Sequence, residues 1–389
     1  MKPINIIVAG DIMPSDNNFT LFEKGDVESL FGNTIVKIFN EADYSIANLE
    51  GALTDSIIAQ QKDGPGIKAP KETINGIKNL QIKALTLANN HITDYLQKGC
   101  IDTIDALENE GINYLGLINK GEEELLCSGK YLSISLKGYH ICFYNVSETF
   151  FNRPTKEMMG ANVYDEWIVC NEIKELKKVH DFLVVIYHGG AEYFPYPTPL
   201  IRTRFHRMAK SGADFITAQH THCIGCEEWY HNSYLLYGQG NFLFARQKMF
   251  PHLTKQGLVT EINLSDNGFS IKNHIVKIVD GVLKYDTDQD FKAFRERSLK
   301  LNDEEFVISE YQKLKVGELK NKYLLASKGN YPLQRILKHF FPRYSKFPET
   351  TYNIRQVLRN YNVLQGERRR EDMYYVWKYI LDNYGKNDK

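Results

Sequence analysis

Polar residues of the kinds that bind metal ions follow five apolar stretches of strand length. They are Asp, Glu, Asn and His, whose oxygen and imidazole donors suit manganese, iron or zinc without any thiolate. The stretches and the polar residues after them are Ile4–Ala9 with Asp11, Tyr44–Ala47 with Asn48 and Glu50, Ile82–Ala88 with Asn90 and His91, Phe182–Tyr187 with His188, and Asp214–Ala218 with His220 and His222.

The joint placement of these residues is more informative than any one of them. A single Asp or His after a strand is usually a cap or a turn residue, and an Asx-turn would account for Asp11 or Asn90 alone. It would not account for imidazoles at several equivalent strand ends. Because sites in open α/β sheets lie outside the carboxyl ends of strands, we expect the donors to converge on one edge. Two metal ions there would need a bridging carboxylate, which Glu50 could supply, and would keep a water or hydroxide between them as nucleophile.

The elements that must position these donors alternate between apolar and amphipathic stretches, which is typical of a layered α/β domain. Asp26 is suited to cap a helix that begins at Val27. From about residue 288 the chain changes to charged amphipathic segments, which predicts a domain over 1–287 and a helical C-terminal region over 288–389. Two antiparallel hairpins are also expected, so the sheets should be mixed; they are Tyr131–Leu136 with Tyr139–Val146 and Leu258–Leu264 with Phe269–Val276.

Composition narrows the classes of function. The chain has 48 basic and 48 acidic side chains, so no overall field attracts nucleic acid. The first apolar run is too short for a signal peptide, and nowhere do eighteen apolar residues run together. We therefore expect a cytoplasmic protein without a transmembrane segment. The six cysteines suit reduced thiols better than a disulfide framework.

Eight sequence blocks between about residues 4 and 246 resemble the CapA family, the poly-γ-glutamate capsule biosynthesis proteins. These proteins are similar to calcineurin-like metallophosphoesterases. The resemblance implies an α/β fold of the metallophosphoesterase type, a four-layer αββα sandwich with mixed sheets. The blocks are Gly10–Met13, Asn48–Glu50, Ala88–His91 with Asp94–Tyr95, His188–Tyr193, Tyr196–Pro199, Gly212–Asp214, His220–His222 and Gly240–Phe244.

The same resemblance implies roles for individual residues and one or two divalent ions. His91 would protonate the leaving atom or stabilise charge beside it. Met13 stands where the phosphoesterase superfamily usually has a His, so the first ion would lack an imidazole. Glu192 and Tyr193 would line the substrate pocket, and Asn241 would orient the site. The implied metal ligands are Asp11, Glu50 and His222 at one ion, and Glu50, Asn90, His188 and His220 at the other.

Other constellations have competing interpretations. Cys223, Cys226 and His231 could imitate a zinc site, but there is no second cysteine pair. The aromatic residues beside His188 could stack on a sugar or hold a peptide-like chain, or could simply be half-buried tyrosines. Three arginines, Arg202, Arg204 and Arg207, could bind an anionic substrate or face solvent.

Two functional hypotheses remain. The first is a metal-dependent hydrolase of capsule or exopolymer biosynthesis that attacks a phosphoester or a γ-glutamyl amide with a metal-activated water. Its partner would be an anionic polymer, a precursor of that polymer or a phosphoester. The second is a non-catalytic assembly component that holds a polymer end in the same pocket. We favour the hydrolase, because the donors recur at five strand ends.

Overall fold

The computed structural model describes residues 1–313 except 63–64, 120–128, 151, 157 and 245–251. The chain divides into two compact units, Met1–Tyr311 and Gln312–Lys389. Residues 288–311 therefore belong to the first unit, and the boundary at 287/288 stays a prediction. The helices predicted beyond residue 313 lie outside the described residues.

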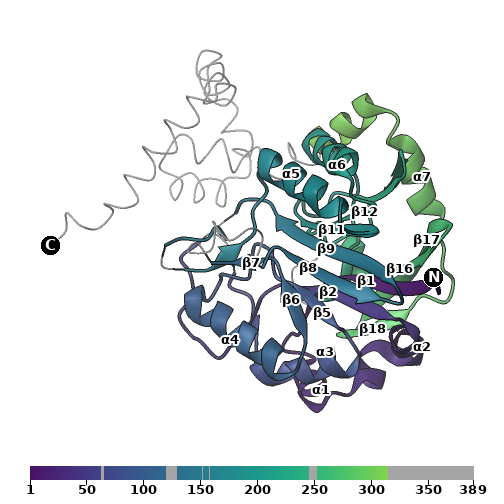
Figure 1. Ribbon diagram of the computed structural model, residues 1–389. Coiled ribbons are helices and arrows are strands. Elements are labelled where there is room, and N and C mark those ends of the chain that lie inside the picture. Colours follow the sequence, from purple (N-terminus) through teal and green to yellow (C-terminus); the bar gives the residue numbers. More distant parts are fainter. Residues whose placement is uncertain (63–64, 120–128, 151, 157, 245–251, 314–389) are drawn as a thin grey trace, which may run out of the picture. The chain divides into compact units, whose positions relative to one another are not determined.

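The first sheet of unit 1 is built around the central strand β1, which is buried on both faces (Figure 1). Ile6 and Val8 pack into one apolar cluster, whereas Ile7 and Ala9 pack into another. This alternation explains the unbroken apolar run, because a strand covered on both sides has no solvent face. The eight strands run in the order β18 (Val282–Tyr285), β17 (Gly268–Val279), β16 (Gln256–Ser265), β1 (Ile4–Met13), β2 (Tyr44–Leu49), β5 (Ala84–Thr86) and β6 (Asn113–Leu115), with β15 (Asn241–Phe244) also pairing with β1.

The second sheet has six strands, and its four central strands are parallel. Antiparallel strands close both edges, which confirms that the sheets are mixed. Both predicted hairpins form, as β8 with β9 and as β16 with β17. The order is β13 (Glu227–Tyr230), β14 (Ser233–Leu236), β12 (Phe215–Gln219), β11 (Phe182–His188), β9 (Tyr139–Ser147) and β8 (Tyr131–Leu136).

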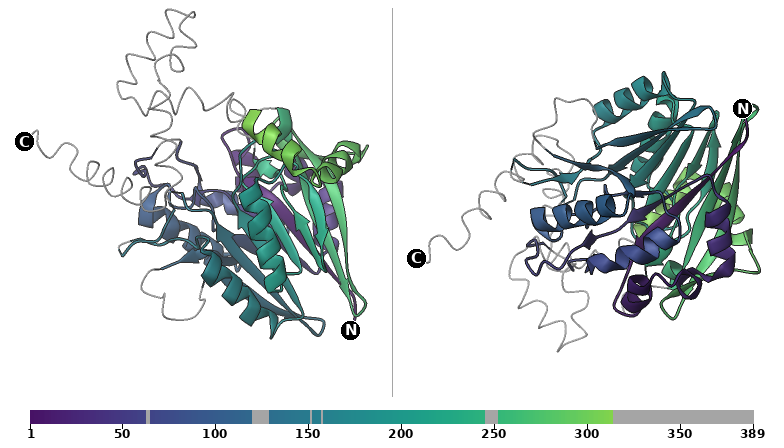
Figure 2. Two further views of the ribbon diagram at one scale, coloured as in Figure 1. Left: turned by 90° about the horizontal axis from the view of Figure 1, so that it is seen from above. Right: turned by 60° about the horizontal axis from the view of Figure 1, so that its bottom comes forward.

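Helices cover the outer faces of both sheets, which gives the expected four-layer αββα arrangement (Figure 2). Phe31 of α2 stacks on Phe242 of the first sheet, and Phe205 of α6 packs edge-on against Tyr187 of the second. Asp26 caps α2 through Ser29 N, as predicted. The helices are α1 (Phe19–Lys24), α2 (Val27–Glu41), α3 (Ile74–Asn79), α4 (Leu96–Asn109), α5 (Glu166–Lys177), α6 (Pro199–Ser211) and α7 (Lys292–Lys300), with 3-10 turns η1 (Lys71–Thr73) and η3 (His252–Lys255).

The core between the two sheets fixes their relative position. Val8 of β1, Phe143 of β9 and Val184 of β11 all belong to this apolar cluster. Two short strand pairs form outside the two main sheets. They are β3 (Ala52–Leu53) with β4 (Lys68–Ala69) and β7 (Leu117–Ile118) with β10 (Gly160–Ala161).

The strand ends that carry the polar residues belong to two sheets, so the expectation of a single sheet edge was wrong. Strands β1, β2 and β5 lie in the first sheet, whereas β11 and β12 lie in the second. Their carboxyl ends meet at the same end of the sandwich, where His188 of the second sheet lies 4.0 Å from Asp11 and 3.7 Å from Glu50. Strand β1 also continues past Asp11 to Met13, since its last residues pair with β15.

Candidate metal centre

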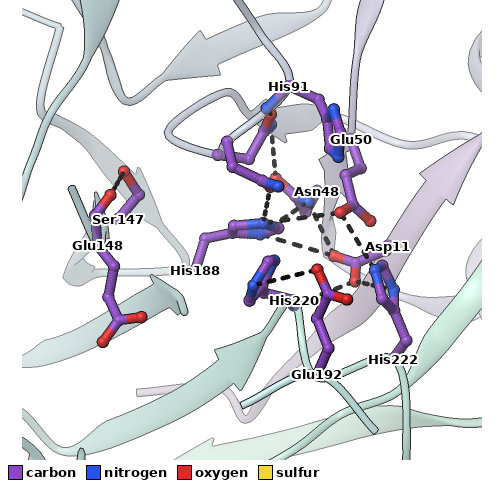
Figure 3. A network of polar contacts seen from close by, with 12 residues as sticks. Asp11, Asn48, Glu50, His91, Ser147, Glu148, His188, Glu192, His220 and His222 are labelled. Atoms are coloured by element: carbon purple, nitrogen blue, oxygen red, sulfur yellow. Dashed lines mark hydrogen bonds and ion pairs between the residues drawn. The ribbon is translucent and has the colours of Figure 1, made fainter. Parts of the chain in front are cut away.

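Two carboxylates lie at the centre of the polar cluster, and both are fully buried (Figure 3). Asp11 Oδ1 accepts a hydrogen bond from Asn48 Nδ2 at 2.8 Å, and Asp11 Oδ2 accepts one from His220 N at 3.2 Å. Glu50 differs, because neither of its carboxylate oxygens has a hydrogen-bond partner among the described residues. Burial raises the pKa of Glu50 well above its usual value, and the negative charge of Asp11 adds to the shift.

His188 and His222 approach Glu50 from different strands of the second sheet. His188 Nε2 lies 3.7 Å from Glu50 Oε1 and 2.8 Å from Asn90 Oδ1. His222 Nε2 lies 3.5 Å from the same Glu50 oxygen. Burial alone would lower the pKa of His222, but the carboxylates of Glu50 and Asp11 raise it to about 10.

Asn241, the first residue of β15, fixes the ring of His222. Its Nδ2 donates to Thr254 O at 3.0 Å, which leaves Oδ1 to accept from His222 Nδ1 at 2.9 Å. With Nδ1 held in this way, Nε2 is the ring nitrogen of His222 that faces Glu50.

His220 completes the group from the loop after β12. Its Nδ1 is buried and has no hydrogen-bond partner among the described residues, and its Nε2 lies 3.8 Å from Glu192 Oε1. Burial lowers the pKa values of His188 and His220 well below the usual value, so both rings are neutral and have a lone pair to offer. Glu50, His220 and His222 each place one ligand atom within 4.8 Å of the others.

The backbone of this loop adopts a left-handed conformation that residues other than glycine rarely take. His220 has φ of 82° and His222 has φ of 54°. Such positions cost about 1–3 kcal/mol each and persist only where the surroundings hold them. Here Gln219 Nε2 bonds to Ala9 O across the two sheets at 3.1 Å. The loop is therefore held against β1, close to Asp11.

His91 lies at the edge of the cluster and has a charge network of its own (Figure 3). Its Nδ1 is 2.7 Å from Asp94 Oδ2, and Lys62 Nζ forms an ion pair with Asp94. Ile67 N also donates to Asp94 Oδ2, at 2.8 Å. Burial lowers the pKa of His91. No motif in the sequence pointed to Lys62, which lies in the loop between β3 and β4.

The structure brings nearly all the sequence-predicted site residues together. Asp11, Asn90, His188, His220 and His222 surround Glu50 or contact residues that do. Tyr193 lies farther out, with its ring 6.1 Å from that of His222 and inclined to it by 30°. Glu192 is about half exposed beside His220, with 46% of its side chain accessible.

Glu148 is a residue that sequence reasoning missed. It directly follows β9, whose last residue pairs with His188 at the end of β11, so the same strand-end signal could have found it. Its Oε2 accepts from Gly190 N at 3.1 Å, and its Oε1 pairs with Arg204 Nη1 at 2.9 Å. Glu148 thereby attaches the loop that follows His188 to helix α6.

The competing constellations have structural explanations. Cys223 and Cys226 are buried, and burial raises the pKa of each thiol to about 12, so neither is a ready thiolate. Within the described part of the chain, the metal-ligand group contains no cysteine. The tyrosine beside His188, Tyr187, bonds to Arg204. The three arginines all pair with glutamates, namely Arg202 with Glu228, Arg204 with Glu148 and Arg207 with Glu166.

The donor set fits a divalent metal ion. Buried polar atoms are almost always paired, so the unpaired Glu50 oxygens and His220 Nδ1 need an explanation. A cation would pair with them, because a carboxylate and a neutral imidazole can each offer it a lone pair, and Glu50, His220 and His222 place one ligand atom each within 4.8 Å of the others. Met13 is fully buried where an imidazole was expected from the superfamily pattern, and it brings only a weak thioether acceptor.

Comparison with known proteins gives two curated relatives. The chain is 27% identical over 279 residues to the capsule biosynthesis protein CapA of Bacillus anthracis, covering 69% of this chain and 66% of that protein. It is 28% identical over 264 residues to the PGA biosynthesis protein CapA of Bacillus subtilis strain 168, covering 67% of each. The alignments thus span about two thirds of the relatives' length.

Among solved structures, the chain is similar to a phosphatase from Mycoplasma pneumoniae, with a TM-score of 0.46 and 15% identity over 76% of this chain and 99% of that one. None of the described helices is long and apolar enough to cross a membrane.

A family model gives the assignment. The model for the bacterial capsule synthesis protein PGA_cap matches residues 5–246, which is more than half of the chain and includes every residue of the candidate metal centre. This protein therefore belongs to the PGA_cap family of bacterial capsule synthesis proteins.

Proposed function

We propose that this protein is a metal-dependent hydrolase of bacterial capsule or exopolymer biosynthesis. The observation that carries the proposal is the buried Glu50 carboxylate, whose two oxygens have no hydrogen-bond partner among the described residues and which lies in a group with His188, His220 and His222. The names of the two CapA relatives support the role in capsule synthesis.

The candidate ligands divide around Glu50. The family resemblance assigns Asp11 and His222 to one side, and His222 Nδ1 lies 3.5 Å from Asp11 Oδ2. Asn90, His188 and His220 would serve on the other side. Manganese, iron or zinc suits this mixture of carboxylate, amide and imidazole. Such a cation supplies Lewis acidity and lowers the pKa of a water so that it can attack at neutral pH.

The protein's own groups prepare the remaining steps. Asp94 accepts from His91 Nδ1, which leaves His91 Nε2 as the nitrogen that exchanges a proton with a leaving atom. Lys62 holds Asp94 in place through an ion pair in which both side chains are almost fully buried. Tyr193 and Glu192 form the outer part of the site, where a substrate chain would enter.

The substrate class follows from this chemistry. A phosphoester or an amide of the γ-glutamyl type offers an electrophilic centre and an oxygen anion in the transition state. We propose that the substrate is an anionic polymer or its precursor and not a nucleic acid, because the chain has no net positive charge. The cytoplasmic location stays a prediction.

The test is turnover by purified protein with and without Mn²⁺. A generic phosphodiester, a phosphomonoester and a γ-glutamyl anilide serve as substrates. We expect Mn²⁺-dependent release of product, lost by at least 100-fold in His188→Ala. His140→Ala is the matched control, because His140 is exposed on β9. Undiminished activity in His188→Ala would refute the hydrolase.

A second candidate is a non-catalytic component that holds a polymer end. Met13 favours it, because the side of the site with Asp11 lacks one imidazole. On this hypothesis the protein binds the polymer with Mn²⁺ present and turns over none of the three substrates. Any Mn²⁺-dependent turnover that His188→Ala abolishes would exclude it.

A further inference from the structure

Glu192 lies next to one of the two ring nitrogens of His220. The two nitrogens of an imidazole point in different directions, and in the neutral ring only one carries hydrogen. In His220, Nδ1 is the buried and unpartnered nitrogen, whereas Nε2 is the one 3.8 Å from Glu192 Oε1 (Figure 3). A carboxylate on the Nε2 side favours hydrogen on Nε2 and leaves the lone pair on Nδ1.

The backbone holds the two residues in this relation. Tyr193, which follows Glu192, donates its N–H to the carbonyl of Thr221, which follows His220, at 2.8 Å. Gly190, two residues before Glu192, is bonded to Glu148, and Glu148 is paired with Arg204. The loop with Glu192 is thus fixed both to the His220–His222 segment and to helix α6.

The ring of His220 has further restraints. The Phe150 ring lies 5.0 Å from it, and the ring of His188 lies 5.0 Å away as well. His220 also has a positive φ of 82°, which other contacts must maintain. These restraints set where the ring lies, but they do not choose which nitrogen carries hydrogen. That choice depends on a polar partner.

His222 offers a precedent within the same site. Asn241 Oδ1 accepts from His222 Nδ1 at 2.9 Å, so Nε2 is presented to Glu50. His220 uses the opposite nitrogen and therefore needs its acceptor on the opposite side of the ring. Glu192 is on that side.

We propose that Glu192 is a positioning residue for His220, its carboxylate 3.8 Å from Nε2 favouring hydrogen on that nitrogen so that the lone pair of Nδ1 is left for a divalent cation. The proposal rests on the proposed function, in that the site binds a metal. It changes the role expected for Glu192, from lining the substrate pocket to setting the tautomer of a metal ligand. Partners of this kind typically change metal affinity by about 10–100-fold when removed.

The experiment compares full-length wild type and Glu192→Ala by NMR with ¹⁵N-labelled histidine, in metal-free protein. A His220→Gln variant assigns the signals. We expect wild-type His220 to show a protonated Nε2 and an unprotonated Nδ1, and Glu192→Ala to show averaged shifts of both nitrogens. An unchanged His220 tautomer in Glu192→Ala would overturn the proposal.

Calorimetric titration with Mn²⁺, without substrate, gives the second measurement. Where wild type binds Mn²⁺, we expect at least tenfold weaker binding by Glu192→Ala, and no change in Glu166→Ala, whose carboxylate is exposed on α5. A residue that only touched substrate would leave Mn²⁺ affinity unchanged, and that result would also overturn the proposal. A wild-type protein that binds no Mn²⁺ refutes the proposed function instead, and the tautomer comparison then decides the role of Glu192.

Discussion

Replacing Glu50 by glutamine should stabilise the metal-free protein and at the same time remove its response to metal. Glu50 is fully buried, neither of its oxygens has a hydrogen-bond partner in the part of the chain that the structure describes, and Asp11 is its acidic neighbour. A buried polar group without a partner costs about 1–3 kcal/mol. The glutamine amide has nearly the same shape, carries no charge and can donate to Asp11. We therefore expect Glu50→Gln in a chelator to be about 1–3 kcal/mol more stable than wild type.

The pH dependence of this difference has a definite sign. Burial and Asp11 raise the pKa of Glu50 in the folded protein above the ordinary value of 4.5. Such a raised pKa does not lower the folding stability at a pH below the pKa of the unfolded chain. The loss of stability grows as the pH rises above that value, because the unfolded chain ionises first. The advantage of Glu50→Gln should therefore be small near pH 4.5 and larger at pH 8.

Added metal should reverse the order of stability. At a Mn²⁺ concentration about 100 times the Kd, binding stabilises the folded state by about 2.7 kcal/mol. Wild type should gain this, and Glu50→Gln should gain far less because it has lost the central carboxylate. Thermal unfolding with chelator and with Mn²⁺ measures both effects, at about 2–4 °C per kcal/mol. Glu166→Gln is the control, since Glu166 is exposed. Equal Mn²⁺ responses of wild type and Glu50→Gln, or a less stable variant in chelator, would refute the reasoning.

Three further predictions concern other parts of the structure. A Cβ at Gly10 would lie 2.1 Å from Gly240 O, so Gly10→Ala should destabilise the protein by about 1–3 kcal/mol in urea unfolding. An unchanged midpoint would contradict the packing of β1 against the backbone of Gly240. Thr198 Oγ1 accepts from Ile201 N at 3.3 Å to cap α6, so Thr198→Ala should cost about 1 kcal/mol in the same assay, while Thr198→Ser should cost less. Because the carboxylates raise the pKa of His222 to about 10, Mn²⁺ must displace a proton from His222 at neutral pH. The affinity for Mn²⁺ should therefore rise with pH, by up to about tenfold per pH unit for each proton released. Calorimetry in two buffers that differ in ionisation enthalpy should detect that release. Affinity independent of pH would show that no proton is displaced.

Much of the site could be predicted from the sequence, because apolar runs mark the buried strands and the site residues follow the strand ends. Four of the five predicted strands end within two residues of the observed strand ends. These ends were predictable because buried positions tolerate few polar residues. The exception is β1, which continues from the predicted Ala9 to Met13. Its extension depends on pairing with β15, more than 200 residues later, and no local pattern encodes such a partner.

Other features were hidden for the same reason. Lys62 lies in a polar loop, and its importance comes only from its ion pair with Asp94, 32 residues away. The division of the donors between two sheets also depends on how the sheets pack, which periodicity does not reveal. Residue types at strand ends were thus predictable, whereas contacts between distant loops were not.

The central claim is that a divalent cation is held at Glu50 between the carboxyl ends of strands from both sheets. Crystals of the full-length protein grown with Mn²⁺, measured at the manganese absorption edge, test this claim most directly. The account predicts an anomalous peak within coordinating distance of Glu50 and of a nitrogen of His220 or His222. A well-ordered site without such a peak, or a peak elsewhere in the molecule, would contradict it.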